Sequence, residues 1–180
     1  NPGSELADFL RKALVPGQLP ELVAHNIATL CGDFLSLLSG SVNLPQNARA
    51  ARNALTTEGV GAFNDKFSQG LPSTWGGDGP GKVNGVHYYS WSGVLPANGL
   101  PSLDPIQGVH RALSQYFMTE GQQNDGFVGR FSSHLGQVIR SDYPLDHLST
   151  LRRPANGLSS QLDPIGLYVE HAARLKAANL

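Results

Sequence analysis

The sequence predicts an α/β fold with helices toward both ends and strands between them. Apolar residues recur at helical spacing in the first and last segments of the 180-residue chain. Between them, residues 86–94 are rich in β-branched and aromatic side chains and follow an Asn-Gly pair, a tight-turn signal. The visible strands are too few for a complete doubly wound sheet, so we expect only a portion of one.

Three helical stretches are predicted in the first third of the chain. Ser4 caps a short amphipathic run. A longer helix opens at Pro20 and ends near Ser39. Its apolar residues recur every three or four positions: Val23, Ile27, Leu30, Phe34, Leu37 and Leu38. Residues 48–63 form the third stretch, which Thr56 divides by starting a new helix.

The remaining elements follow from turn residues and short apolar runs. Residues 71–83 hold so many glycines and prolines that we expect an irregular loop. The segment 86–94 carries the best strand signal, and 137–140 is another short apolar stretch. Asp163 as a cap and Pro164 at the first helical position predict a final helix.

Composition and charge exclude several classes of protein. The chain has 13 basic and 14 acidic residues with no run of like charges, which excludes a nucleic-acid binder. Its apolar stretches fall short of the roughly 18 continuous residues that a membrane span needs. Cys31 is the single cysteine, so no internal disulfide can form, and its helical setting predicts a buried small hydrophobe.

Two short segments place an acid before a base. They are QQNDG at 122–126 and PLDHL at 144–148, and this is the order in which α/β-hydrolases present the last two members of their triad. The G-x-S-x-G elbow that would carry a nucleophilic serine occurs nowhere in the sequence. Ser90 and Ser92 lie in YSWSG, which is no such elbow, so we interpret them as strand residues.

Each of these two residues also has an ordinary structural interpretation. An Asn-Asp-Gly triplet is typical of a tight turn, which would explain Asp125 without catalysis. His147 is one of 6 histidines, and an isolated histidine is more often a packing or surface residue. His134 is the main rival for the role of base, and the other competitors are His25, His87, His110 and His171.

Several motifs in register carry a resemblance to a known family. They are SELADFLRK at 4–12, KVNGVHYYSWSG at 82–93, NDGFVG at 124–129, SSHLG at 132–136 and HAARLK at 171–176. In this order they resemble the C-terminal part of secreted bacterial triacylglycerol lipases of the Pseudomonas and Burkholderia type. The resemblance implies that residues 1–180 are the C-terminal portion of a single α/β-hydrolase domain whose N-terminal, nucleophile-bearing half is absent from this chain.

The same resemblance implies that Asp125 is the triad acid and His147 the triad base. A histidine titrates near neutral pH, so neutral His147 can take the serine proton and return it to the leaving alcohol. A buried carboxylate at Asp125 would hold the imidazole in the required tautomer and stabilise the imidazolium.

Residues 20–40 resemble the family's lid, an amphipathic helix over the active-site cleft, although a core helix would show the same apolar stripe. Exposing six large apolar side chains costs roughly 1.5–3 kcal/mol each, or about 10 kcal/mol or more in total. We therefore expect a lid that is closed in water and opens at a lipid surface.

The resemblance also implies a structural calcium beside the catalytic histidine and, in many members, a disulfide. Asp104, in Leu-Asp-Pro, matches one calcium ligand, but Ser149 replaces the second aspartate and Arg153 falls near a neutral ligand position. Calcium gains affinity from carboxylate charge, so these changes predict a weakened site. Trp75-Gly76 and Phe131 stand where the cysteines would be, which indicates a divergent or engineered member.

The functional hypothesis is a lipase-type carboxylic ester hydrolase to which this chain contributes acid, base and lid, with no cofactor for catalysis. One alternative is an aliphatic polyester depolymerase of the same fold. Another is a non-catalytic module that binds lipid or a partner through the stripe from Val23 to Leu38. The resemblance implies acylglycerol or other ester substrates at a lipid interface, secretion from a Gram-negative cell and a lipase-specific foldase.

Overall fold

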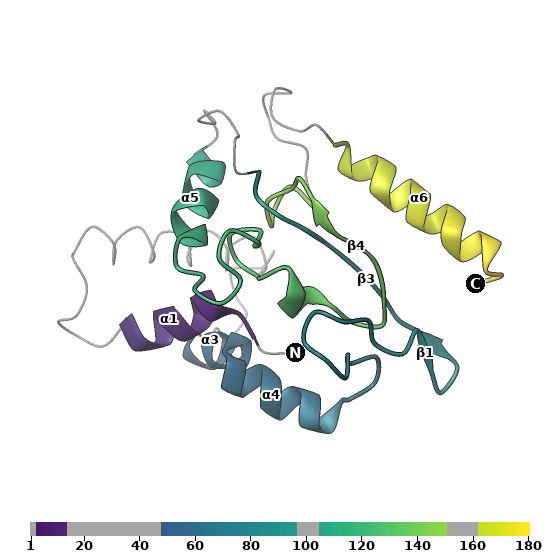
Figure 1. The fold of residues 1–180 in the computed structure, drawn as a ribbon, viewed down its shortest axis with the longest axis horizontal. Helices are drawn as coiled ribbons and strands as arrows, with labels where there is room; N and C mark the ends of the chain where they lie inside the picture. Colours follow the sequence, from purple (N-terminus) through teal and green to yellow (C-terminus); the bar gives the residue numbers. More distant parts are fainter. Residues whose placement is uncertain (1–2, 14–47, 97–104, 151–161) are drawn as a thin grey trace, which may run out of the picture.

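The computed structural model describes residues 3–13, 48–96, 105–150 and 162–180, and their helices and two small sheets are drawn in Figure 1. In chain order the elements are α1 (Glu5–Ala13), α3 (Ala48–Leu55), α4 (Thr57–Lys66), β1 (Lys82–Val83), β2 (Val86–His87), β3 (Tyr89–Gly93), α5 (Pro105–Ser114), a 3₁₀ turn (Phe131–Ser133), β4 (Gln137–Tyr143) and α6 (Pro164–Ala177). The predicted lid at 20–40, Cys31, Asp104 and Arg153 lie outside the described residues.

The predicted helix starts are confirmed where the structure describes them. Ser4 Oγ accepts from the Ala7 amide at 3.4 Å at the start of α1. Thr56 separates α3 from α4 and caps α4, because its hydroxyl oxygen accepts from the Gly59 amide at 3.1 Å. Asp163 caps α6 by accepting from the Ile165 amide at 3.2 Å.

The predicted strand at 86–94 divides into two strands in two different sheets. Its first residues form β2, which pairs antiparallel with β1 across a turn in which Asn84 (φ 51°) and Gly85 (φ 83°) are both left-handed. These angles are what a two-residue hairpin turn requires. The later residues form β3, which leaves the hairpin at Tyr88 and pairs with β4 instead.

Strands β3 and β4 run parallel, so their carboxyl ends meet at the same edge. The register runs from Tyr89 opposite Gln137 to Gly93 opposite Tyr143. Just past β3, the Leu95 amide donates to the Asn124 carbonyl at 2.9 Å. The residues that follow β4 therefore emerge beside the loop that contains Asn124.

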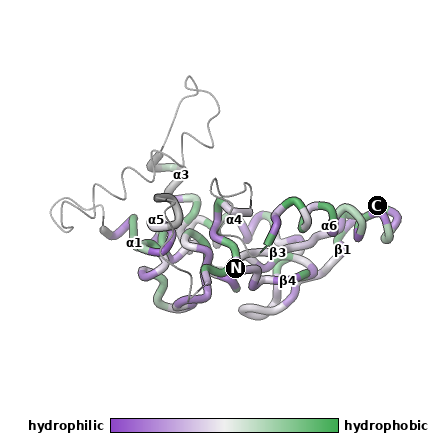
Figure 2. Tube along the Cα trace, turned by 90° about the horizontal axis from the view of Figure 1, so that it is seen from above, coloured by the Kyte–Doolittle hydropathy of each residue, from purple (hydrophilic) through white to green (hydrophobic). Residues whose placement is uncertain are grey.

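Two hydrophobic clusters flank this edge. Leu6, Leu10, Leu113 and Phe117 form one beneath α1 and α5, and Tyr143, Leu145 and Leu167 form the other beneath α6. Figure 2 shows α1 and α5 toward one end of the molecule and α6 with β1 toward the other. In the described part of the chain, no helix is long and apolar enough to cross a membrane.

Candidate active site

Asn124 fixes the loop that carries the predicted acid. The Asn124 residue is fully buried, and its amide nitrogen donates to the Gly121 carbonyl at 2.6 Å and to the Ser114 carbonyl at 3.3 Å. Its side-chain oxygen accepts from the Gly126 amide at 2.9 Å. Asparagine thus satisfies backbone groups on both sides of itself and holds Asp125 in one orientation.

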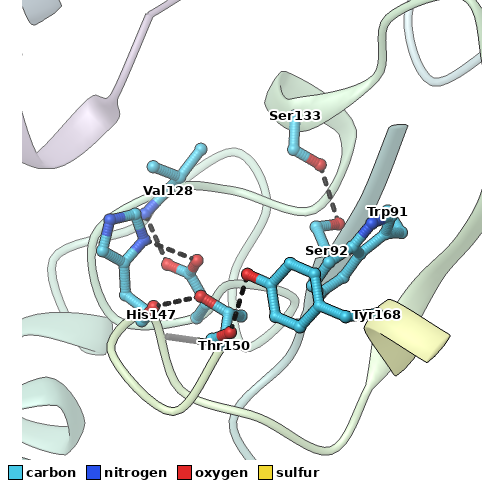
Figure 3. Close-up of a pocket in the computed structure, with 9 residues that line it drawn as sticks. Trp91, Ser92, Val128, Ser133, His147, Thr150 and Tyr168 are labelled. Carbon is cyan, nitrogen blue, oxygen red and sulfur yellow. Dashed lines mark hydrogen bonds and ion pairs between the residues drawn. The ribbon is translucent and has the colours of Figure 1, made fainter. Parts of the chain in front are cut away.

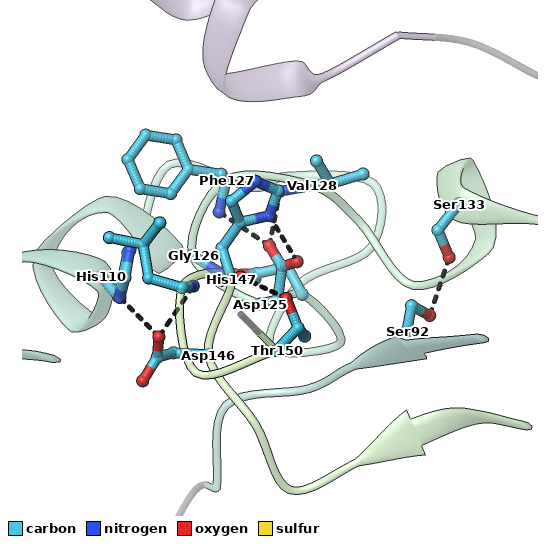
Figure 4. Close-up of polar contacts among 12 residues, drawn as sticks. Ser92, His110, Asp125, Gly126, Phe127, Val128, Ser133, Asp146, His147 and Thr150 are labelled. Atoms are coloured by element: carbon cyan, nitrogen blue, oxygen red, sulfur yellow. Dashed lines mark hydrogen bonds and ion pairs between the residues drawn. The ribbon is translucent and has the colours of Figure 1, made fainter. Parts of the chain in front are cut away.

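The structure brings Asp125 and His147 together. Asp125 Oδ2 lies 2.8 Å from His147 Nδ1, and the His147 amide donates to the Asp125 carbonyl at 3.0 Å. The other carboxylate oxygen, Oδ1, accepts from the Phe127 amide at 3.0 Å and the Val128 amide at 2.7 Å, as Figure 4 shows. One oxygen therefore orients the carboxylate while the other faces the imidazole.

Burial and charge act on His147 in opposite directions. Its side chain is 30% exposed, whereas that of Asp125 is 9% exposed. Burial lowers the pKa of His147, but the hydrogen bond and charge of Asp125, together with the charge of Asp146, outweigh burial and raise it above its ordinary value. A buried carboxylate and a partly exposed imidazole are the arrangement expected of an acid that assists a base.

His147 and Asp125 line a hollow of about 290 Å³ at the carboxyl edge of the parallel strands, shown in Figure 3. Ser92 and Ser133 line it as well, but their hydroxyl oxygens lie 2.8 Å from each other, and Ser133 Oγ also bonds the Arg130 carbonyl at 2.6 Å. Ser90 Oγ accepts from the Leu135 amide at 3.1 Å. These contacts join strands and loops, in agreement with the structural interpretation of Ser90 and Ser92.

His134, the rival base, has different surroundings. The His134 residue is 4% exposed, its Nδ1 lies 3.2 Å from the Gly77 carbonyl oxygen, and its ring meets the edge of Phe131 at 5.7 Å. Phe131 also contacts Gly76, where an added Cβ would approach the ring to 3.0 Å. The two places where the resemblance would put cysteines are therefore adjacent, and His134 packs beside them.

Another histidine and aspartate lie in contact and are more deeply buried than Asp125 and His147, and the sequence analysis did not predict this pair. His110 Nδ1 lies 3.2 Å from Asp146 Oδ1, with side chains 0% and 4% exposed. The spacing from Asp146 to Ser149 is that of a side chain that caps its own turn, and this signal could have identified the aspartate. No local pattern marks His110 as its partner.

The described part of the expected calcium site has a neutral hydroxyl where the resemblance implies a carboxylate. Ser149 Oγ donates to Asp146 Oδ2 at 2.5 Å, so it brings no charge of its own, whereas calcium gains affinity from carboxylate charge. Among the described residues, no three His, Cys, Asp or Glu side chains cluster as a metal site would require.

Comparisons with known proteins support the resemblance seen in the motifs. No family model matches the chain. It is 57% identical over 184 residues to a protein of Pseudomonas fragi named triacylglycerol lipase, covering 100% of this chain and 63% of that protein. Proteins with the same name from Vibrio cholerae and Burkholderia plantarii are 39% and 31% identical, with 99% and 97% of this chain and 56% of each relative covered. The chain spans less than two thirds of the length of these relatives.

Proposed function

We propose that this chain, similar over its whole length to proteins named triacylglycerol lipase, supplies the acid and the base of a lipase-type carboxylic ester hydrolase. The observation that carries the proposal is the 2.8 Å contact between Asp125 Oδ2 and His147 Nδ1 beside a hollow. We place the nucleophilic serine and the oxyanion-hole donors in an N-terminal part of a longer protein, because the chain contains no G-x-S-x-G.

Each described group has a step in this chemistry. A hydrogen on Nδ1 of His147 is held by Asp125, which leaves Nε2 as the acceptor for the serine proton. As the serine oxygen attacks the ester carbonyl, the proton moves to Nε2 and then to the departing alcohol. A water molecule then repeats the sequence on the acyl-enzyme, with Nε2 taking the proton of water and returning it to the serine.

The remaining features of the proposal concern the complete protein. We propose an α/β-hydrolase fold in which β3 and β4 are part of a larger sheet, with residues 20–40 as a lid that opens at a lipid surface. The substrates would be acylglycerols or related esters. We further propose secretion from a Gram-negative cell with the help of a lipase-specific foldase.

The first experiment determines the mass of the purified protein under native and denaturing conditions, together with its hydrolysis of p-nitrophenyl butyrate and triolein. A serine-reactive phosphonate is then added. We expect a second or longer polypeptide to take up the phosphonate, and His147→Ala to abolish hydrolysis while the control His87→Ala does not. A chain of 19.2 kDa that is alone, unlabelled and inactive would contradict the proposal and favour a non-catalytic lipid-binding module. Faster hydrolysis of an aliphatic polyester than of triolein would favour a depolymerase.

A further inference from the structure

We propose that His110, Asp146 and Ser149 form a buried anchor that positions the turn carrying His147. This inference rests on the proposed role of His147 as a base and adds three positioning residues that do not touch the reacting atoms. The anchor joins this turn to α5, which also packs beneath the loop carrying Asp125. It would thus fix the position of His147 relative to Asp125.

Asp146 organises the turn from within. Its Oδ1 accepts from the Leu148 amide at 3.0 Å and the Ser149 amide at 2.9 Å, and its Oδ2 accepts from the Ser149 hydroxyl at 2.5 Å. The backbone on the C-terminal side of His147 is therefore tied to the residue on its N-terminal side. Such a closed turn leaves His147 little freedom to move relative to Asp146.

His110 ties this turn to α5. Its Nδ1 lies 3.2 Å from Asp146 Oδ1, and both side chains are almost completely buried. The contact is close but is not aligned as a hydrogen bond, because neither ring nitrogen of His110 has an aligned hydrogen-bond partner among the described residues. A carboxylate this deeply buried needs hydrogen-bond donors, and Asp146 finds them in the Leu148 and Ser149 amides and the Ser149 hydroxyl.

His110 also touches the loop that carries the acid. Its ring meets the edge of Phe127 at 5.0 Å and 78°, and Phe127 in turn lies 5.3 Å from the His147 ring. A Cβ added at Gly126, which has φ +96°, would lie 2.7 Å from the His110 Cβ. Figure 4 shows His110 and Asp146 on one side of Phe127 and Gly126, with the Asp125–His147 pair on the other. One buried histidine therefore contacts both catalytic loops.

The anchor also contributes charge. In the described part of the chain, the charged or titratable groups around His147 include Asp125, Asp146 on its own turn and His110 on α5, behind Phe127. Tyr168 of α6 lines the same hollow. Burial raises the pKa of Asp146, but contacts with His110 and Ser149 outweigh it and lower the pKa to about 2, so Asp146 stays ionised at neutral pH. Its charge adds to that of Asp125 in raising the pKa of His147.

The test uses the complete enzyme with Asp146→Asn, His110→Gln and Ser149→Ala, and with Asp142→Asn as the control. Asp142 pairs with Arg140 on the surface and lies outside the anchor. We expect kcat for p-nitrophenyl butyrate to fall about 10- to 100-fold in Asp146→Asn and His110→Gln with KM nearly unchanged, as for other outer-shell partners of functional histidines. The loss should be smaller in Ser149→Ala, and the control should match the unmodified enzyme.

Two readouts separate positioning from a loss of folding. In Asp146→Asn the acid limb of the pH–rate profile should move to lower pH, because one of the two carboxylates that raise the pKa of His147 is gone. The downfield Nδ1 proton resonance of His147 should broaden or shift in all three variants. If Asp146→Asn fails to fold, the same resonance and kcat of His110→Gln and Ser149→Ala decide whether the anchor positions His147.

Unchanged kcat, pH limb and resonance in the folded variants would overturn the anchor. Asp125→Asn, measured in parallel, distinguishes this result from failure of the proposed function. If Asp125→Asn is inactive while the anchor variants are normal, only the anchor is wrong. If Asp125→Asn is also fully active, the acid–base assignment itself is wrong.

Discussion

Two aspartates in this chain have the same local hydrogen-bond arrangement but different proposed roles. Asp125 and Asp146 each accept, through one oxygen, from the backbone amides two and three residues farther along. Each also faces Nδ1 of a histidine. The difference is burial, because His147 is 30% exposed and lines the hollow whereas His110 is 0% exposed. Solvent access to the imidazole therefore separates the proposed acid–base pair from the proposed anchor.

Replacing Asp125 by asparagine should leave the shape of the loop and remove its chemistry. An amide at position 125 can still accept from the two backbone amides, but it cannot stabilise an imidazolium or enforce the required tautomer. If the proposed role is right, kcat/KM of the complete protein for p-nitrophenyl butyrate should fall by about 10⁴-fold, as for the acid of known Ser-His-Asp triads. Asp142→Asn serves as the control, and an equal loss in both variants would argue against a specific role for Asp125.

Asp146 should contribute to stability in a pH-dependent way. Its pKa is lowered to about 2 from 3.8, so its contribution is complete above about pH 4 and is lost as the pH falls toward 2. The shift corresponds to about 2 kcal/mol of unfolding free energy. Urea unfolding measures the unfolding free energy of the unmodified chain and of Asp146→Asn at about pH 5 and about pH 2.5. The difference in unfolding free energy between them should be smaller at the lower pH. A difference of constant size would show that the carboxylate charge does not matter.

At this scale the sequence identified the residues with local signals. Asp125 and His147 were predicted from the resemblance of their motifs to lipases, because turn chemistry and chain order alone leave an ordinary structural interpretation open, and the structure places the two residues in contact. The pairing of His110 with Asp146 could not be predicted, because it depends on how α5 packs beneath a distant turn. The catalytic role of Asp125 and His147 stays a prediction.

At the scale of elements, local capping was predictable and partner choice was not. Thr56 and Asp163 were recognised as caps because the cap is encoded within a few residues. Helix α5 was not predicted, since it is 10 residues long and has a glycine, Gly108, in its interior. The break at Tyr88 was missed as well, because β propensity does not tell which neighbouring strand a residue will pair with.

Helix α6 should be held in place mainly by Leu167. This side chain is buried against Tyr143 and Leu145 just before the turn that carries His147. We expect Leu167→Ala to lower the unfolding free energy by about 2–4 kcal/mol through lost burial and the cavity that remains. Val169→Ala on the same helix is the matched control, because Val169 is 62% exposed and its change should stay within about 0.5 kcal/mol. Urea unfolding of the chain measures both, and equal losses would refute this packing role.

The turn after β4 should not depend on calcium. Ser149 directs its hydroxyl at Asp146, and this turn is closed by its own hydrogen bonds. We expect the thermal midpoint to be the same in EDTA and in millimolar calcium, since only an ion that binds the folded state can raise it. Magnesium serves as the control for ionic strength. A calcium-specific rise in the midpoint would show that Asp104 and residues outside the described part complete a site that Ser149 does not block.

At the scale of the whole molecule, the proposed catalytic pair lies between two hydrophobic clusters. Phe127, next to the acid loop, packs against the cluster beneath α1 and α5. Leu145, two residues before His147, belongs to the cluster beneath α6. Asp125 is held next to the first cluster and His147 next to the second. The distance from Asp125 to His147 therefore depends on how the two clusters are held relative to each other. Contacts between the two sides, such as that of His110 with Asp146, therefore help to set the distance between Asp125 and His147.

The parallel sheet leads to the last prediction. Within the described residues β3 and β4 pair only with each other, whereas parallel sheets normally have more strands and are covered on both faces. We therefore expect the isolated chain to melt at a lower temperature than the complete enzyme and with a broad transition. Adding the separately prepared N-terminal part should raise the midpoint progressively, roughly with the logarithm of its concentration, because it would bind only the folded chain. Circular dichroism measures the transition, with an unrelated protein at equal concentration as the control. A sharp transition of the isolated chain that the N-terminal part does not shift would mean that this sheet is complete as it stands, and the proposal that it is part of a larger sheet would be wrong.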